Sequence, residues 1–227
     1  MQVGTLSRNL MQTMIFDISP RVCRATGVFP GDVPFERTLS MTRAAGQSVN
    51  LSSIRSTVHL GAHADAPWHY DDEGLDIAGV PLEAYWGPAL VIRCQVDRGQ
   101  RVSAEEALKQ MASFASGHRP WRCLIHTGTF PDPNKWNRDF AALSPELIWT
   151  LKQRECVLVG IDTPSVDPES SEDLPSHRAL FETGILNLEG LVLDHIEAGW
   201  YELVALPLKL MGLDGSPVRA ALRTLRP

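Results

Sequence analysis

Residues 59–70, HLGAHADAPWHY, contain three of the chain's seven histidines. Within this stretch His59, His63 and His69 surround one acidic residue, Asp65. Imidazole nitrogen and carboxylate oxygen together suit zinc, manganese or iron, whereas calcium and magnesium prefer shells made of oxygen alone. The stretch therefore predicts a metal site, and the rest of the chain is expected to be organised around it.

The backbone of this stretch is predicted to be a tight loop or a single irregular turn. His59 and His63 would lie ~13 Å apart along a strand but only ~6 Å apart along a helix axis. Gly61 and Pro67 both disfavour a long regular helix. The β-like run of residues 54–58 leads into the turn.

The composition is that of an ordinary globular protein. The chain has 227 residues, of which 44% are hydrophobic and 21% are charged, enough for one domain with its own core. Its formal net charge of −6 gives no reason to expect nucleic-acid binding. No apolar stretch approaches the ~20 residues that a membrane helix needs, and the first residues lack the pattern of a signal peptide. Neither nucleic acid nor a membrane is an expected partner.

The cysteines indicate a reducing compartment. Four are present, and they are widely spaced. Cys94, Cys123 and Cys156 lie in apolar, strand-like runs, which predicts buried free thiols rather than disulfides. The expected location is the cytoplasm.

Strands and helices are expected to alternate along one domain. Apolar runs predict strands and capping patterns predict helices. Strands are expected at residues 14–19, 89–94, 122–127 and 156–161, and helices at residues 103–111 and 144–154. The fold class is α/β, with a mixed sheet or open barrel-like core flanked by helices. Residues 14–227 form the domain, residues 1–13 form an N-terminal tail, and the loop of residues 128–140 is expected near the pocket.

The stretch at residues 59–69 resembles the His-x-Gly-(Thr/Ala)-His-x-Asp-x-Pro-x-His signature of the metal-dependent cyclase family. Further segments resemble the same family, among them Ile-Asp-Thr-Pro at residues 161–164 and Gly-Ser-Pro-Val-Arg at residues 215–219. The matches run from Asp17 to about Arg223. The resemblance implies a swivelling β/β/α fold and a homodimer whose N-terminal segment reaches the partner's active site.

The resemblance also implies a set of metal ligands. His59, His63, Asp65 and Glu189 would hold one divalent ion, and His177 would hold a second, with Asp65 and Glu189 bridging the two. Taken alone, His177 and Glu189 look like ordinary surface residues. The ions are expected to be zinc, with manganese as the alternative, since the ligand set suits several metals.

The family's bacterial kynurenine formamidases (arylformamidases) hydrolyse N-formylkynurenine to kynurenine and formate in tryptophan degradation. By this resemblance the partner of the chain is a small aryl formamide, attacked at its formyl carbon by hydroxide formed at the metals. His69 is left to move the proton as general acid and base, or else only to orient ligands. No Gly-x-Ser-x-Gly motif supports a serine-hydrolase route.

Phe29 departs from the family pattern, which has a tryptophan at this position in the substrate pocket. Phenylalanine keeps an aromatic face for a substrate but lacks the indole N–H; a plain core residue is the alternative. The departure keeps two other functions open. One is hydrolysis of a cyclic amide such as isatin, and the other is an inactive metal-bound binding or scaffold protein.

The remaining histidines and two acidic residues are interpreted as structural. His118, His126 and His195 match no family motif. Asp162 and Asp167 lie in a turn bounded by prolines, where capping of the turn by their own side chains is the expected role.

Overall fold

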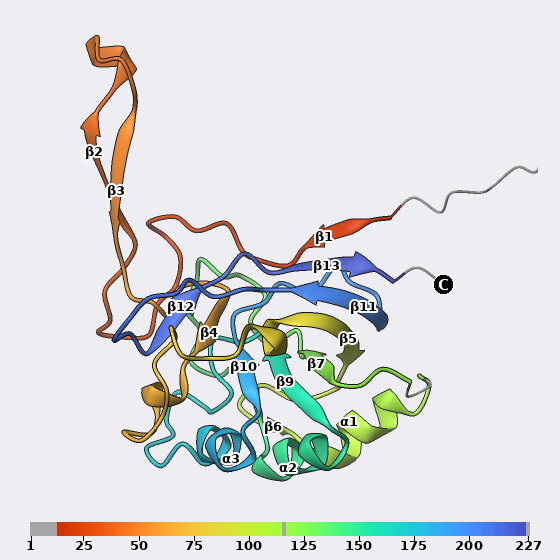
Figure 1. The fold of residues 1–227 in the computed structure, drawn as a ribbon. Helices are drawn as coiled ribbons and strands as arrows, with labels where there is room; N and C mark the ends of the chain where they lie inside the picture. Colours follow the sequence, from red (N-terminus) through yellow and green to blue (C-terminus); the bar gives the residue numbers. More distant parts are fainter. Residues whose placement is uncertain (1–12, 115–116, 226–227) are drawn as a thin grey trace, which may run out of the picture.

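A seven-stranded mixed sheet forms the centre of the computed structural model, which describes residues 13–114 and 117–225 (Figure 1). Its strands lie in the order β1 (Ile15–Asp17), β13 (Ala221–Thr224), β11 (Gly199–Val204), β5 (Trp86–Arg93), β7 (Trp121–His126), β9 (Cys156–Ile161) and β10 (Leu186–Leu188). The pairs from β1 to β5 are antiparallel, and those from β5 to β10 are parallel. The sheet is open, as expected for this fold class. Of the predicted tail, residues 1–12 lie outside the described residues.

Helices connect the parallel strands and lie together on one side of the sheet (Figure 1). They are α1 (Ala104–Met111), α2 (Pro145–Gln153) and α3 (Pro175–Thr183). The predicted caps are present: the hydroxyl of Ser103 accepts from the backbone N–H of Glu106, and Ser144 accepts from Leu147. The strands and helices predicted from apolar runs and caps are thus confirmed to within a few residues.

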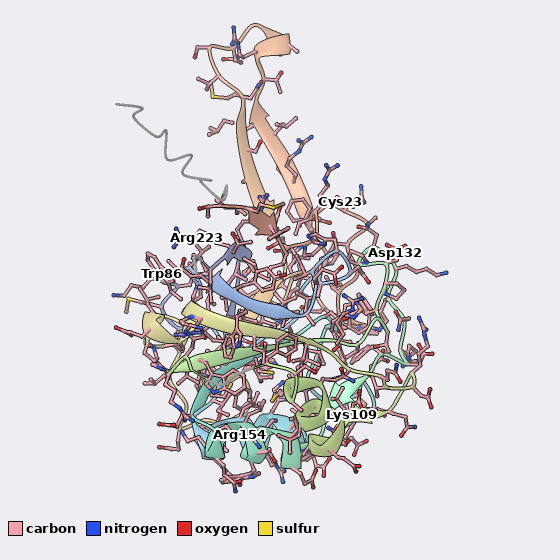
Figure 2. The ribbon with its side chains drawn as sticks, turned by 90° about the vertical axis from the view of Figure 1, so that its right-hand side faces the viewer. Cys23, Trp86, Lys109, Asp132, Arg154 and Arg223 are labelled. Atoms are coloured by element: carbon pink, nitrogen blue, oxygen red, sulfur yellow. The ribbon has the colours of Figure 1, made fainter. Side chains whose placement is uncertain are left out.

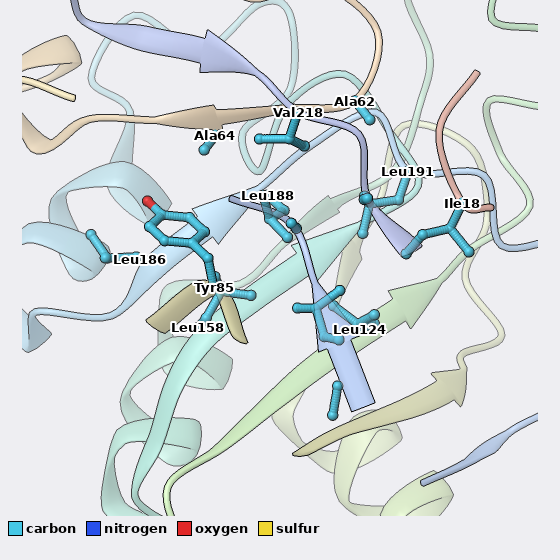
Figure 3. Close-up of a cluster of buried hydrophobic side chains, with 14 of the residues drawn as sticks. Ile18, Ala62, Ala64, Tyr85, Leu124, Leu158, Leu186, Leu188, Leu191 and Val218 are labelled. Atoms are coloured by element: carbon cyan, nitrogen blue, oxygen red, sulfur yellow. The ribbon is translucent and has the colours of Figure 1, made fainter. Parts of the chain in front are cut away.

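The core has two layers because strand side chains alternate between the faces of the sheet. In β7, Cys123 and Ile125 pack against the helices, whereas Leu124 points to the opposite face. There Leu124 joins Leu158 and Leu188 in the cluster drawn in Figure 3. All of these side chains are buried, as expected for parallel strands covered on both faces.

Within the described residues, three two-stranded sheets accompany this centre. β4 (His63–Asp65) pairs with β12 (Gly215–Pro217), and β6 (Arg101–Val102) pairs with β8 (Ala142–Leu143). The third pair is β2 (Glu36–Met41) and β3 (Leu51–Arg55), which projects from the body as a long hairpin (Figures 1 and 2). Short 3₁₀ turns complete the fold, namely η1 (Arg43–Ala45), η2 (Pro67–His69) and η3 (Leu82–Tyr85).

The stretch at residues 59–69 is more regular than the predicted loop or single turn. It contains strand β4 and the 3₁₀ turn η2. The prediction failed because β4 is only three residues long and exists through its pairing with β12, far away in sequence. The β-like run at residues 54–58 is also divided, since β3 ends at Arg55 and belongs to the projecting hairpin.

The cysteines are free thiols, as predicted from the sequence. Cys94, Cys123 and Cys156 are buried and Cys23 is exposed, and all four are free.

No helix in the described part of the chain has the length and apolar character to cross a membrane.

Candidate metal centre and active site

The candidate site lies at the carboxyl ends of the parallel strands. Glu189 directly follows β10, Asp162 directly follows β9, and the loop of residues 128–140 follows β7. The carboxyl ends of parallel strands meet at one edge of an open sheet, where ligand sites of α/β proteins commonly form. The fold therefore brings Glu189 and the predicted pocket loop to the same edge.

Strand β4 is held directly against this edge. His63 and Glu189 exchange two backbone hydrogen bonds, of 3.1 and 3.0 Å. The approach is close enough that a Cβ on Gly190 would lie 2.1 Å from the carbonyl oxygen of Gly61, and Gly190 has φ +64°. On β4 itself, Ala64 points into the core (Figure 3), which leaves His63 and Asp65 to face the site.

Four of the predicted residues meet in a first cluster. Asp65 Oδ1 lies 2.9 Å from His59 Nδ1 and 3.4 Å from His63 Nε2. Glu189 Oε2 lies 3.3 Å from the same Nε2 of His63. His59, His63 and Asp65 offer one ligand atom each within 4.8 Å of one another.

A second cluster shares the same two carboxylates. His177 Nε2 lies 3.7 Å from Asp65 Oδ2 and 3.6 Å from Glu189 Oε1. The other nitrogen of this ring, Nδ1, donates to Asp167 Oδ2 at 2.8 Å. Asp65 and Glu189 thus lie between two groups of imidazoles, with one oxygen directed to each.

The donor atoms of His63 fit a bound cation. Its Nδ1–H donates to the carbonyl of Gly61 at 2.9 Å, which leaves the lone pair on Nε2. That Nε2 is buried without a hydrogen-bond partner among the described residues, although two carboxylate oxygens face it. A lone pair opposite two carboxylates requires a positive charge between them. Nitrogen and carboxylate oxygen are the donors of zinc and similar metals.

The same demand for positive charge appears in the pKa values of the two imidazoles. Burial lowers the pKa of His63, but the carboxylates of Asp65 and Glu189 outweigh it and raise the value to about 10. Burial likewise lowers the pKa of His59, and hydrogen bonds to Asp214 and Asp65 raise it to about 9. Protons therefore occupy these nitrogens when no metal does.

The last two predicted residues, His69 and Phe29, line a cavity beside these clusters. Its volume is about 360 Å³, within the ~300–1,000 Å³ range of small-molecule sites. His69 follows β4 in the turn η2, and its ring lies 4.1 Å from that of His59 between centroids. Phe29 packs edge-on against Trp136, with centroids 5.9 Å apart.

Comparison with known proteins identifies the family. The model of the Cyclase family matches residues 6–168 of this chain. The chain belongs to the Cyclase family. Across 215 residues it is 43% identical to the kynurenine formamidase of Delftia acidovorans (strain DSM 14801 / SPH-1), covering 95% of this chain and 100% of that protein.

Solved structures with the same fold are more distant in sequence. Isatin hydrolase A from Labrenzia aggregata, bound to benzyl benzoate, has a TM-score of 0.82 at 21% identity and covers 94% of each chain. A structure from Bacillus stearothermophilus, described as a "predicted metal-dependent hydrolase", has a TM-score of 0.77 at 24% identity, covering 94% of this chain and 99% of that one. These likenesses establish the fold, which is confirmed as α/β with a mixed sheet.

Three further residues of this Cyclase-family site are not among the predicted site residues. Asn187 donates through Nδ2 to Asp65 Oδ2 at 2.6 Å and to Glu189 Oε1 at 3.1 Å. Asp167 accepts from His177 and from Arg101, so its expected role as a cap of its own turn is wrong. Asp214 contacts His59 and His69. In the sequence, the only indication of this role is its position directly before the family-like segment Gly-Ser-Pro-Val-Arg.

Asp162 also differs from the expectation of a self-capped turn. Its carboxylate accepts from the backbone N–H groups of Thr127 and Gly128, at the start of the loop after β7. Asp162 therefore fixes the pocket loop to the end of β9.

Phe130 and Trp136, in the loop of residues 128–140, form an aromatic wall beside Phe29. Trp136 packs against both Phe29 and Phe130, each at 5.9 Å between centroids. The indole N–H of Trp136 donates to Glu169 Oε2 at 2.6 Å, which fixes the ring. The chain thus has a tryptophan, Trp136, directly beside Phe29.

Proposed function

We propose that this chain is a metal-dependent arylformamidase that hydrolyses N-formyl-L-kynurenine to L-kynurenine and formate. The main support for this proposal is 43% identity to a kynurenine formamidase over that protein's whole length. The assembled site supports it, since His59, His63, Asp65, His177 and Glu189 converge beside a cavity of suitable size. A scaffold protein would need neither the cavity nor His69.

The proposed cofactor is a pair of divalent cations, with zinc preferred to manganese. His59 and His63 would hold one ion and His177 the other, with Asp65 and Glu189 contributing oxygens to both. This division is supported by the two ligand clusters, which share Asp65. When bound, the ions would supply acidification of a water and stabilisation of the negative charge that develops on the formyl oxygen.

His69 is the proposed proton carrier. Its Nδ1 is engaged by Asp214 at 3.1 Å, which leaves Nε2 to exchange protons in the cavity. Nε2 takes a proton from the attacking water as the new C–O bond forms. It returns this proton to the aniline nitrogen as the formyl C–N bond breaks. A positioned acid and base of this kind contributes ~10²–10⁴-fold in rate.

The aromatic wall is the proposed binding surface for the aryl ring. Phe29 and Trp136 line the cavity together, with their rings at 77° to each other, and both would supply aromatic surface to a planar ligand. Trp136 would add aromatic area beside Phe29, which stands where the resemblance places a tryptophan. This supports an aromatic substrate for the chain.

The test compares turnover of N-formylkynurenine and isatin by purified protein. Preferential release of kynurenine is expected, and His69→Ala should lose most of this activity while retaining bound metal and fold. Turnover of isatin alone would replace the proposal by a cyclic-amide hydrolase. Full activity in His69→Ala would remove that residue from the mechanism.

We propose further that the chain forms a homodimer through the hairpin of β2 and β3. An isolated two-stranded hairpin is marginally stable in water, yet this one exposes Leu51 at 51% and Ile54 at 70%. Light scattering should give the mass of two chains, and Ile54→Glu should shift it to one. Leu82→Glu, a control at an exposed leucine outside the hairpin, should leave the mass unchanged. A monomeric parent would contradict the proposal.

The proposed compartment is the cytoplasm. The four free cysteines support it, because reducing conditions keep such thiols unpaired. Fractionation of cells that produce the chain would test it, and recovery outside the cytoplasmic fraction would contradict it.

A further inference from the structure

One oxygen of Asp214 contacts two imidazoles of the site. Asp214 Oδ2 lies 3.0 Å from His59 Nε2 and 3.1 Å from His69 Nδ1. The two rings lie beside each other, with centroids 4.1 Å apart. A proposed metal ligand and the proposed proton carrier therefore donate to the same carboxylate oxygen.

Backbone contacts fix the position of Asp214. Asp214 immediately precedes β12, whose Gly215 lies opposite Asp65 of β4. The N–H of Ala66 donates to the carbonyl of Asp214 at 2.8 Å. A Cβ on Gly215 would lie 3.0 Å from His59 Cε1, so this segment runs directly against the His59 ring. The strand that carries Asp65 thus also positions Asp214.

For His59, the contact determines which nitrogen can bind a metal. A proton on Nε2 is held by Asp214, so Nδ1, which faces Asp65 Oδ1 at 2.9 Å, is the nitrogen that would bind a metal in place of its own proton. Carboxylates behind ligand histidines fix the tautomer and raise the basicity of the ligating nitrogen. Loss of Asp214 would free the ring to rotate or to change tautomer.

For His69, the contact determines which nitrogen moves the proton. The N–H at Nδ1 donates to Asp214, so Nε2 is the nitrogen that accepts and returns a proton. The imidazolium that forms lies against a carboxylate, as in His–Asp pairs of other hydrolases. An uncharged residue at position 214 would leave this cation without its partner.

We propose that Asp214 is a positioning residue that fixes the tautomers of His59 and His69 together, and so couples metal binding to proton transfer. The part that concerns His69 rests on the proposed formamidase activity, whereas the part that concerns His59 rests on the proposed metal site alone. Substitution of Asp214 should therefore produce two defects, one in zinc binding and one in proton transfer, which can be separated by experiment.

The test measures zinc affinity and steady-state kinetics of Asp214→Asn in the parent protein and in the His69→Ala variant. Competition with a chromophoric chelator should show zinc binding about 10- to 100-fold weaker, the range for residues behind metal ligands. At saturating zinc, kcat should fall about 10- to 100-fold with little change in KM, because the defect lies in proton transfer. In the His69→Ala background the kcat defect should disappear while the zinc defect remains.

Two control variants are measured in the same way. Glu155→Gln removes a surface carboxylate that pairs with Arg119 just before β9, at the end of the sheet opposite the site, and it should change neither readout. Asp214→Ala should regain part of its kcat in acetate, which can place a carboxylate in the vacated space. Rescue of this kind would not occur if Asp214 served only to hold the local fold.

Unchanged zinc affinity in Asp214→Asn would overturn the role at His59. A kcat loss of equal size with and without His69 would overturn the role at His69. A parent protein that turns over no formamide would overturn the proposed function and the role at His69 with it. The chelator competition would still decide the role at His59, so the two failures can be told apart.

Discussion

Asn187 allows the strongest test of how the two carboxylates are held. It is completely buried, and its Nδ2 donates to both Asp65 and Glu189. Each hydrogen bond to a charged group contributes ~1.5–3 kcal/mol, so Asn187→Ala should destabilise the metal-free protein by about 3 kcal/mol or more. For a chain of this length ~1 kcal/mol shifts Tm by ~2–4 °C. The expected fall is therefore about 6–12 °C in the presence of chelator.

The assay is thermal unfolding with chelator and with zinc, together with chelator competition for zinc affinity. Affinity should fall ~10–100-fold, since the carboxylates lose their fixed orientation. Asn187→Asp nearly keeps the shape but places a third negative group between the two carboxylates, and it should lose at least as much. Asn50→Ala, an exposed control whose side chain accepts from Arg43 in the hairpin, should change affinity little. Parental Tm and zinc affinity in Asn187→Ala would show that Asn187 does not hold the two carboxylates.

Three more predictions follow from the same geometry. Metal-free protein should lose stability as pH rises from ~6.5 through 9–10, because the pKa of His59 is raised to about 9 and that of His63 to about 10 in the folded state. His59 alone accounts for about 3 kcal/mol at ~1.36 kcal/mol per pKa unit, present below ~6.5 and lost above its folded value; urea unfolding across this range would show it, and a flat profile would contradict it. Asp167→Asn should reduce bound zinc from two ions to one by atomic emission, since Asp167 holds the ring of His177; two retained ions would count against that role. Trp136→Ala should raise KM for N-formylkynurenine ~2- to 10-fold, the value of one aromatic contact of ~0.5–1.5 kcal/mol, and an unchanged KM would exclude stacking there.

Local pattern was enough to predict part of the parallel half of the fold, although neither α3 nor β10 was predicted. Apolar runs mark β7 and β9, and serine caps mark α1 and α2, because these signals depend on neighbours in sequence. The histidine stretch likewise indicated His59, His63 and Asp65, which the structure brings together. What these elements share is that each is specified within about ten residues.

Long-range features could not be predicted in the same way. Strand β4 exists through its partner β12, and the hairpin of β2 and β3 has no core to give it a periodic pattern. Asn187 did leave a signal, since it is a polar residue between Leu186 and Leu188 in a short buried strand. Asp214 left almost none, because its role depends on two rings about 150 residues earlier.

The most direct test of the central claim is a zinc titration of chelator-treated protein, with release of kynurenine from N-formylkynurenine as the readout. Activity should be negligible without metal, and recovery should become complete at two zinc ions per chain, one for each cluster around Asp65 and Glu189. Full activity without zinc, or zinc-loaded protein that leaves the formamide intact, would contradict it.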